Sequence, residues 1–374
     1  MAGIYIHIPF CKKACHYCNF HFSTSLRYKK EMVQAILREI ELQADYLKGE
    51  SLSSIYIGGG TPSLLDMEEL NAIFEQIKQF HSIEKGAEIT LEANPDDLGP
   101  RHLSELSDTL VNRLSIGIQS FSGADLKFMN RAHTAEEAEH CVHWAKEAGF
   151  DNLTIDLIYG SPTTSHQTWQ NNIQKAIDLD VPHLSCYCLT VEPQTPLDYF
   201  VKKGKVEAVD DTKANAQFEQ LMAYSEDHNF IHYEISNFAK ADFFAKHNSN
   251  YWLGVSYLGI GPSAHSYNGK SRQWNVANNT KYLKAIAENE IPFEREILDM
   301  EQQYNEYVLT RLRTIWGCDK QNILAFGQAY WHHFQKNIQT FLRTGQIVEE
   351  KEVYRLSKSG KLMADGIAVE LFWE

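Results

Sequence analysis

Six short apolar runs alternate with helical stretches over roughly the first 200 residues, and this alternation limits the possible folds more than any other feature. The runs are rich in β-branched and aromatic residues, as strands buried in a parallel sheet tend to be. They are GIYIHI from Gly3, SIYIGGG from Ser54, EITLEANP from Glu88, RLSIGIQS from Arg113, NLTIDLIYG from Asn152 and HLSCYCLTVEP from His183. The pattern predicts a parallel α/β sheet, either doubly wound or curled toward a barrel.

The helical stretches carry their own signals. Thr134 and Glu137 have the spacing of a capping box, and the helix that they open places Ala138, Cys141 and Val142 on one side. After Glu192 the alternation ends. We therefore divide the chain into a barrel of residues 1–235, a connecting region of residues 236–290 that contains HNSNYW and GIGPSAHS, and a C-terminal domain of residues 291–374. Two helices, a small wing and a short final helix predict a smaller α+β, winged-helix-like fold for that last domain.

Polar or glycine-rich stretches follow every one of the six strands. They contain three cysteines after the first strand, Gly58–Thr61 after the second, and then Glu92, Gln119, Asp156 and Glu192. In parallel α/β folds, ligands bind at the carboxyl ends of the strands. The sequence therefore predicts one ligand site, shared by all six strand ends.

The cysteines Cys11, Cys15 and Cys18 have the spacing Cys-x3-Cys-x2-Cys, which lets one loop wrap around a metal centre. Thiolates are ligands of zinc and of iron–sulfur clusters. A structural zinc ion needs a fourth protein ligand, for which His7, His16 and His21 are candidates. A [4Fe–4S] cluster held by three cysteines keeps one iron open for a small molecule, so both interpretations stand at this point.

Composition excludes several classes of protein. The formal net charge of −14 argues against nucleic-acid binding, which needs a basic face. No apolar run is long enough to cross a bilayer, and the first residues lack the pattern of a signal peptide. The seven cysteines are odd in number and irregular in spacing, so we expect no disulfide framework. We expect a protein of the reducing cytoplasm.

The motifs CKKACHYC and GGGTP together resemble the radical S-adenosylmethionine superfamily. A wider set resembles its oxygen-independent coproporphyrinogen oxidase-like branch over nearly the whole chain, namely YIHIPFCKKACHYCNF, IYIGGGTPSLL, LEANP, IGIQSF, NRAHT, DLIYGSP and GIGPSAHSY. This resemblance implies a partial (β/α)6, TIM-like barrel. It also implies that Cys11, Cys15 and Cys18 hold a [4Fe–4S] cluster and that S-adenosylmethionine (SAM) binds beside it.

The resemblance further implies a role for each matching position. Tyr5 and Tyr17 would lie near the cluster and the cofactor. Gly59, Gly60 and Thr61 would meet the methionyl end of SAM, with Arg131 pairing with its carboxylate and Glu92 assisting. An arginine fork suits a carboxylate. Gln119 and Asp156 would reach the ribose hydroxyls, and Leu189 would lie against the adenine.

Two functions compete within this branch. The true oxidases typically have the motif Cys-x3-Cys-x2-Cys-x-Cys and usually carry an N-terminal arm before it. In this chain Phe20 stands at the position of the fourth cysteine, and Cys11 follows the start of the chain closely. The chain resembles the heme chaperone HemW family in two features, the phenylalanine at position 20 and an HNxxYW motif. The motif is present here as His247, Asn248, Tyr251 and Trp252. Histidine is a common axial ligand of heme iron, so we expect His247 to contact heme.

The resulting hypothesis is a heme chaperone. It would bind heme, a [4Fe–4S] cluster and SAM, and pass heme to apo-hemoproteins such as membrane respiratory cytochromes, with transient contact at the inner face of the membrane and scope for a homodimer. The alternative is an oxygen-independent coproporphyrinogen III oxidase, which would use a SAM-derived radical for oxidative decarboxylation to protoporphyrinogen IX.

Overall fold

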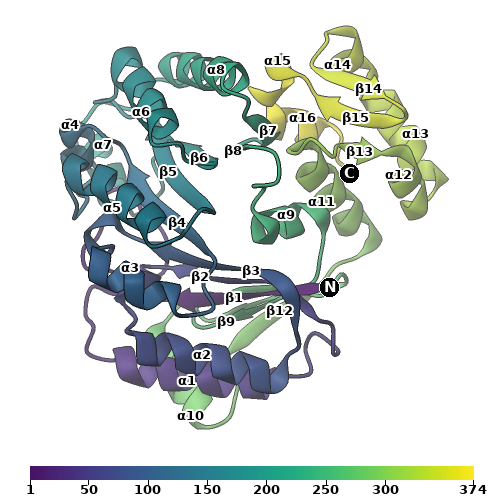
Figure 1. Ribbon diagram of the computed structural model, residues 1–374. Helices are drawn as coiled ribbons and strands as arrows, with labels where there is room; N and C mark the ends of the chain where they lie inside the picture. Colours follow the sequence, from purple (N-terminus) through teal and green to yellow (C-terminus); the bar gives the residue numbers. More distant parts are fainter.

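The computed structural model describes residues 1–374 and brings the six predicted strands together in one sheet. The strands are β1 (Ala2–Ile8), β2 (Leu52–Gly59), β3 (Ile83–Ala93), β4 (Arg113–Gln119), β5 (Leu153–Tyr159) and β6 (His183–Cys188). Each pairs in parallel with the next one along the chain. They curve around a lumen with helices on the outside, which confirms the predicted partial, TIM-like α/β barrel (Figure 1).

Helices follow the strands and cover the outer face of the barrel. They are α1 (Lys29–Leu42), α2 (Met67–Phe80), α3 (Pro100–Ser107), α4 (Gly123–Phe128), α5 (Ala135–Glu147), α6 (His166–Asp178), α7 (Pro196–Lys202) and α8 (Asp211–Asp227), with 3-10 turns η1 (Pro62–Leu64) and η2 (Pro95–Asp97). Helix α5 begins with the predicted capping box, in which Thr134 and Glu137 each accept a hydrogen bond from the other's backbone N–H. Its buried face contains Ala138, Cys141, Val142 and Ala145, as the sequence predicts.

The barrel strands are apolar on the outside and polar on the inside. Along β1, Ile4, Ile6 and Ile8 belong to the main hydrophobic core, whereas Tyr5 and His7 alternate with them on the other face. The same alternation recurs in the other strands, with Tyr56, Glu92, Ser115, Asp156 and Ser185 at inward positions. The lumen of the barrel is therefore lined by side chains that can bind a ligand.

The connecting region extends the barrel sheet on the far side of β1. Strand β9 (Tyr257–Ile260) pairs in parallel with β1, and β10 (His265–Tyr267), β11 (Ser271–Asn275) and β12 (Phe293–Ile297) continue the sheet in antiparallel order. At the opposite edge, β8 (Asn237–Ala239) and β7 (Ile231–Glu234) follow β6. Leu258 and Ile260 pack in the main core with α10 (Asn279–Ala287), so residues 236–290 are part of the barrel unit.

Hydrogen bonds to a buried carboxylate hold the GIGPSAHS motif against the barrel. Glu39 of α1 is fully buried and accepts hydrogen bonds from the Gly261 N–H (2.7 Å), Asn275 Nδ2 (2.6 Å) and the Tyr282 hydroxyl (2.5 Å). Gly261 has a φ of +99°, and a Cβ there would lie 2.6 Å from the His7 carbonyl oxygen. The motif therefore has a structural role, because it fixes the added strands against β1.

The C-terminal domain has a separate hydrophobic core, which runs from Tyr304 to Leu371. Its helices are α11 (Met300–Leu312), α12 (Lys320–Phe326), α13 (Gln328–Asn337), α14 (Gln339–Arg343), α15 (Lys358–Lys361) and α16 (Ala364–Glu370). A small antiparallel sheet joins them, with the order β13 (Cys318–Asp319), β15 (Val353–Leu356), β14 (Ile347–Glu350). The β14–β15 hairpin is the predicted wing.

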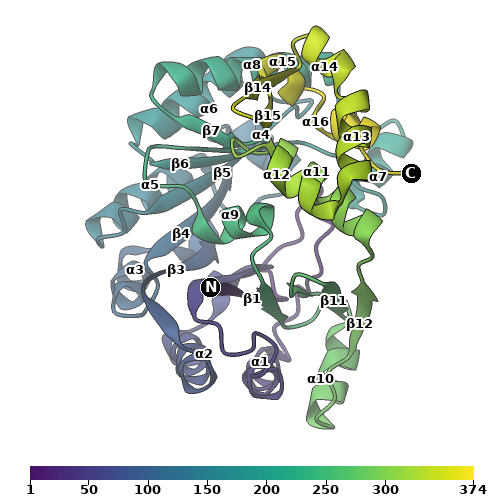
Figure 2. The same ribbon diagram turned by 90° about the vertical axis from the view of Figure 1, so that its right-hand side faces the viewer.

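Helix α9 (Lys246–Leu253), which carries HNSNYW, lies between the barrel and the C-terminal domain in both ribbon views (Figures 1 and 2). The domain holds the end of this helix: Arg311 donates to the Leu253 carbonyl (3.3 Å), and the Arg313 guanidinium lies 5.5 Å from the Trp252 ring centroid.

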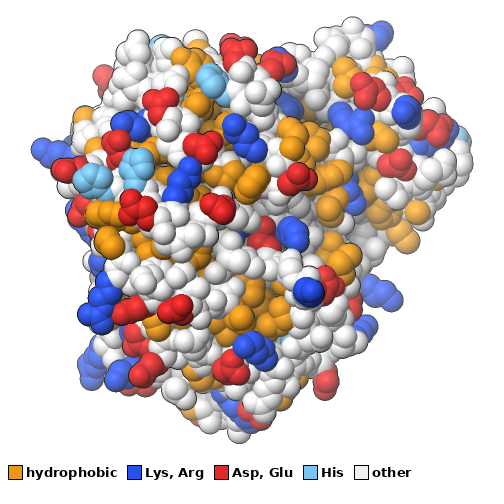
Figure 3. Space-filling model, in the orientation of Figure 1, with side chains coloured by type: hydrophobic (Ala, Val, Ile, Leu, Met, Phe, Trp, Pro, Cys, Tyr) orange, Lys and Arg blue, Asp and Glu red, His pale blue; other side chains and the backbone are white.

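On the face shown in Figure 3, basic and acidic side chains are interspersed. None of the helices has the length and apolar character that a membrane span needs.

Candidate cofactor site

A cavity of about 520 Å³ lies at the carboxyl ends of the barrel strands. Most of the residues singled out in the sequence line it: Cys11, Cys15, Tyr17, Cys18, Gly59, Gly60, Thr61, Glu92, Gln119, Arg131, Asp156 and Leu189. Tyr5 and His247 do not. The volume is within the range of pockets that hold one small molecule or cofactor.

The loop that carries the three cysteines is held in shape by its backbone neighbours. The Cys11 N–H donates to the Ser23 carbonyl (3.1 Å), and the Asn130 side chain donates to the Ala14 carbonyl (2.7 Å). His16 forms a hydrogen bond through Nδ1 to the Phe128 carbonyl (2.8 Å). His16 is thereby part of the loop's scaffold. Since the loop is fixed from several sides, its thiols keep their places at the cavity wall.

All three thiols are free and partly buried. Burial raises the pKa of Cys11 to about 11 and also raises the pKa of Cys18. An Nη1 of Arg131 donates to the Cys15 sulfur at 3.3 Å. A bound metal centre would deprotonate these thiols, because thiolates are the ligands.

The donor groups around the cysteine loop bear on the two metal hypotheses. No three His, Cys, Asp or Glu side chains converge closely enough to coordinate one metal ion, including the candidate zinc ligands His7, His16 and His21. A tetrahedral zinc ion requires four ligands within bonding distance of one atom. Thiolates around an iron–sulfur cluster bind separate irons and do not have to converge. Three free thiols from one loop that line an adjoining cavity are a donor set that fits a cluster.

The GGGTP loop can follow the cysteine loop closely because it has no side chains in the way. The Gly60 N–H donates to the Ile8 carbonyl (2.9 Å) and the Thr61 N–H to the Phe10 carbonyl (2.7 Å). A Cβ at Gly60 would lie 2.5 Å from the Phe10 carbonyl oxygen, and Gly59 has a φ of +106°. These positions require glycine, and the exposed backbone is left to face a ligand.

Two half-buried carboxyl groups, Glu92 of β3 and Asp156 of β5, face the cavity from strands on either side of β4. Glu92 accepts hydrogen bonds from the Tyr56 hydroxyl (2.7 Å) and from the Gly59 N–H (3.1 Å). Burial raises its pKa. Burial, and then the negative charge of Glu92, raise the pKa of Asp156 to about 7. Such a pair suits a ligand that brings a cation and hydroxyl groups, because these would pair with the carboxylates.

Arg131 keeps a donor unused. Its Nη2 donates to the Asn94 side chain (2.7 Å) and the Gly117 carbonyl (2.5 Å), and its Nη1 reaches Cys15. Its buried Nε has no partner. Buried guanidinium nitrogens are usually satisfied. Because Arg131 lines the cavity, its positive charge fits an anionic ligand group.

Gln119 stands at the end of β4 in an unusual conformation. Its φ is +68°, and the register between β4 and β5 is interrupted between Ile116 and Gln119. A non-glycine residue in the left-handed region is strained, and such residues gather at functional sites.

Sequence reasoning missed several residues of the cavity wall, namely Tyr56, Asn94, Ser115, Ser185 and Tyr187. Three of them, Tyr56, Ser115 and Ser185, occupy inward positions well before a strand end, where the alternation of polar and apolar residues could have revealed them. Asn248 of the HNxxYW motif also lines the cavity; the sequence identified the motif, but no sequence pattern shows that its helix α9 reaches this cavity.

His247 lies below the cavity, at the floor of the lumen. It is 2% exposed, and both of its ring nitrogens are engaged: Nδ1 with the Ser54 hydroxyl (2.9 Å) and Nε2 with the Tyr251 hydroxyl (2.9 Å). Burial lowers its pKa to about 3. Tyr5 also lies outside the cavity wall; its hydroxyl is hydrogen-bonded to His7 Nδ1 (3.1 Å) and its ring stacks on Tyr56.

The barrel, the three free thiols and the polar cavity at the strand ends define a radical SAM superfamily protein, and the model described as "Radical SAM superfamily" matches residues 5–176. The chain is similar to "Heme chaperone HemW" of Bacillus subtilis (strain 168), with 32% identity over 98% of each chain. It is also similar to "Heme chaperone HemW" of Haemophilus influenzae, with 31% identity over 99% of this chain and 97% of the other. The chain belongs to the HemW family.

Among solved structures, the chain is similar to coproporphyrinogen III oxidase (HemN) from Escherichia coli. The TM-score is 0.85 with 21% sequence identity, and the match covers 99% of this chain and 90% of the other. At this identity the likeness concerns the fold.

Proposed function

We propose that this protein is a heme chaperone, which binds a [4Fe–4S] cluster and SAM in the barrel, binds heme, and transfers heme to apo-hemoproteins. One observation carries the cofactor part of the proposal: three free thiols, a glycine loop, two carboxyl groups and an arginine line one cavity. Membership of the HemW family supports the heme part.

The assignment of residues follows the chemistry of each group. Cys11, Cys15 and Cys18 would hold the cluster. The backbone of Gly59–Thr61 and Glu92 would bind the methionyl amine of SAM, and the Arg131 guanidinium would bind its carboxylate. Asp156 and Gln119 would bind the ribose, and Leu189 and Tyr17 would provide apolar surface. When bound, the cluster supplies an open iron and redox chemistry.

Heme would dock at the mouth of the cavity. The cavity volume suits one molecule of cofactor size, so a planar macrocycle would have to lie outside SAM. Phe20 lines the cavity and is 67% exposed, a large aromatic surface that a porphyrin could cover. From there heme would pass to an acceptor such as a membrane respiratory cytochrome. Docking to the membrane's inner face and a homodimer belong to the same proposal.

The experiment uses protein reconstituted with its cluster without oxygen. Heme titration should give saturable binding, and mixing with apomyoglobin as a model acceptor should transfer heme. Phe20→Ala should weaken heme binding, whereas Phe150→Ala, a buried phenylalanine outside the site, serves as a control for damage to the barrel. Turnover of coproporphyrinogen III to protoporphyrinogen IX, without heme binding, would overturn the proposal in favour of the oxidase.

A further inference from the structure

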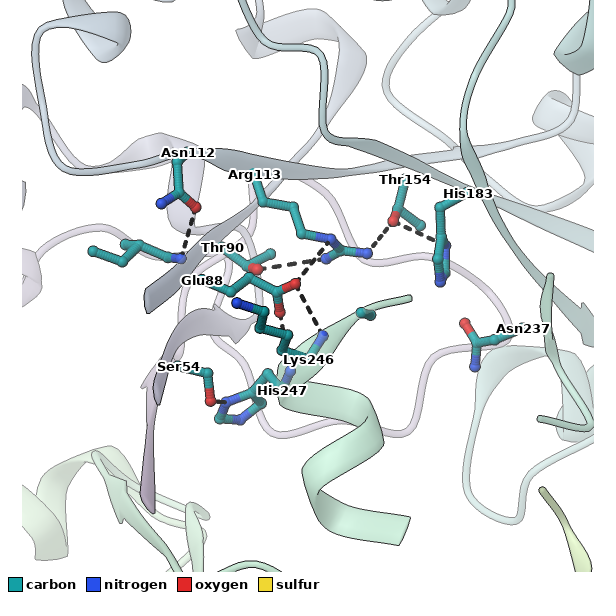
Figure 4. A network of polar contacts seen from close by, with 12 residues as sticks. Ser54, Glu88, Thr90, Asn112, Arg113, Thr154, His183, Asn237, Lys246 and His247 are labelled. Atoms are coloured by element: carbon teal, nitrogen blue, oxygen red, sulfur yellow. Dashed lines mark hydrogen bonds and ion pairs between the residues drawn. The ribbon is translucent and has the colours of Figure 1, made fainter. Parts of the chain in front are cut away.

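The floor of the barrel lumen is closed by α9 through a buried polar network (Figure 4). Glu88 of β3 accepts hydrogen bonds from the N–H groups of Lys246 (2.9 Å) and His247 (3.0 Å), the first two residues of that helix. Glu88 is also 3.8 Å from the Arg113 guanidinium, and both side chains are almost fully buried. The start of α9 is thus fixed to the barrel strands.

This anchoring directs His247 into the lumen. Its ring approaches β1 so closely that a Cβ at Gly3 would lie 3.3 Å from two of its atoms. Ser54 from β2 and Tyr251 from the next turn of α9 hold its two nitrogens. A histidine whose nitrogens are both engaged and whose surface is buried cannot ligate an iron unless α9 leaves the barrel.

His247 nevertheless reaches the cavity indirectly. Its ring stacks on Tyr56 with centroids 5.1 Å apart and an angle of 29° between the planes. The Tyr56 hydroxyl donates to Glu92, which in turn accepts from the Gly59 N–H of the glycine loop. A chain of contacts therefore runs from the HNxxYW motif to the residues assigned to the methionyl end of SAM.

We infer that His247 is a positioning residue for the SAM site, acting through Tyr56 on Glu92, and that it is not a ligand of heme iron. Within the motif, the residue that would touch a bound molecule is its neighbour Asn248, which lines the cavity. Since Arg311 and Arg313 hold the far end of α9, the same helix joins the C-terminal domain to the cofactor site. The inference rests on the proposed SAM binding.

The test compares SAM affinity with the heme spectrum in cluster-loaded protein. His247→Leu removes both hydrogen bonds and the aromatic stack, and Tyr56→Phe removes only the hydroxyl that holds Glu92. Each should weaken SAM binding by about tenfold, as the loss of one well-placed contact does. The double variant should bind SAM no more weakly than the weaker-binding single variant, because His247 and Tyr56 act along one chain of contacts.

The heme Soret maximum should be the same in wild type and His247→Leu, since the iron keeps its ligand. His81→Leu, at a buried histidine elsewhere in the barrel, is the matched control, and melting temperature and iron content report on folding. If His247→Leu does not fold, His247→Gln and Tyr56→Phe take its place. Unchanged SAM affinity together with a shifted Soret band would overturn the inference. Absence of SAM binding by the wild type would instead overturn the proposed function, and the inference with it.

Discussion

Replacing Glu88 by alanine tests how the floor of the barrel is stabilised. The change removes the acceptor for two backbone N–H groups at the start of α9 and the carboxylate beside Arg113. Arg113 is 1% exposed, and its Nε has no hydrogen-bond partner, so the variant leaves a buried charge without a counter-ion. Breaking a buried ion pair in this way costs about 3–5 kcal/mol of unfolding free energy.

The other partners of Arg113 limit the loss. The guanidinium also contacts the hydroxyls of Thr90 and Thr154, and Thr154 is in turn hydrogen-bonded to His183. We therefore expect Glu88→Gln, which keeps a carbonyl acceptor, to cost less than Glu88→Ala. The double variant Glu88→Gln, Arg113→Met removes both charges and should recover part of the lost stability, since a pair can often be replaced by neutral groups at little cost.

The assay is urea-induced unfolding followed by tryptophan fluorescence and far-ultraviolet circular dichroism. Glu105→Ala is the control, because its partner Arg101 is 92% exposed and the pair should contribute under about 1 kcal/mol. A loss below about 1 kcal/mol for Glu88→Ala, or strictly additive effects of the Glu88→Gln and Arg113→Met changes, would refute the reasoning.

Two further predictions concern the cavity wall and acid. Gly60→Ala should abolish SAM binding and lower the melting temperature, because the new Cβ would lie 2.5 Å from the Phe10 carbonyl oxygen. Gly99→Ala is the control and should change neither property, because the space around Gly99 is open. A Gly60→Ala variant with unchanged SAM binding and melting temperature would contradict the close packing of the loop. The second prediction is a loss of stability in acid, since burial lowers the pKa of His247 to about 3 and that of His183 as well. The unfolded chain binds these protons near pH 6.5, so this stability is present above that pH and is lost as pH falls toward 3. Melting temperatures measured between pH 7.5 and 4.5, about the range in which histidine sites titrate, should fall less with decreasing pH in His247→Gln than in wild type. An equal fall of the melting temperature in the two proteins would contradict the prediction.

Much of the fold could be predicted because the strands of the barrel carry local signals. The runs from Gly3 to His183 are short and β-branched, and the capping box at Thr134 marks a helix start by itself. The polar strand ends predicted the cavity for the same reason: residues at the carboxyl ends of parallel strands meet without any long-range contact having to be known.

The rest depends on contacts between segments distant in the sequence. The strands of residues 236–290 are short, and the region looked like a connector, yet Glu39 of α1 accepts hydrogen bonds from Gly261 and Asn275 and holds these strands against the barrel sheet. The position of His247 was also out of reach, because the anchor of α9 is Glu88, separated from it by 159 residues. A motif shows which side chains are present; only the packing shows whether their polar atoms are free.

The cluster and its open iron are the centre of this account, and one measurement tests them most directly. Protein purified and reconstituted without oxygen should contain about four iron atoms and as many sulfides per chain, held by three thiolates. After reduction, its electron paramagnetic resonance signal should change shape when SAM is added. Cys15→Ser should lose the cluster, and Cys141→Ser, in the helix core, should keep it. Zinc in place of iron, or a cluster signal that saturating SAM leaves unchanged, would contradict the account.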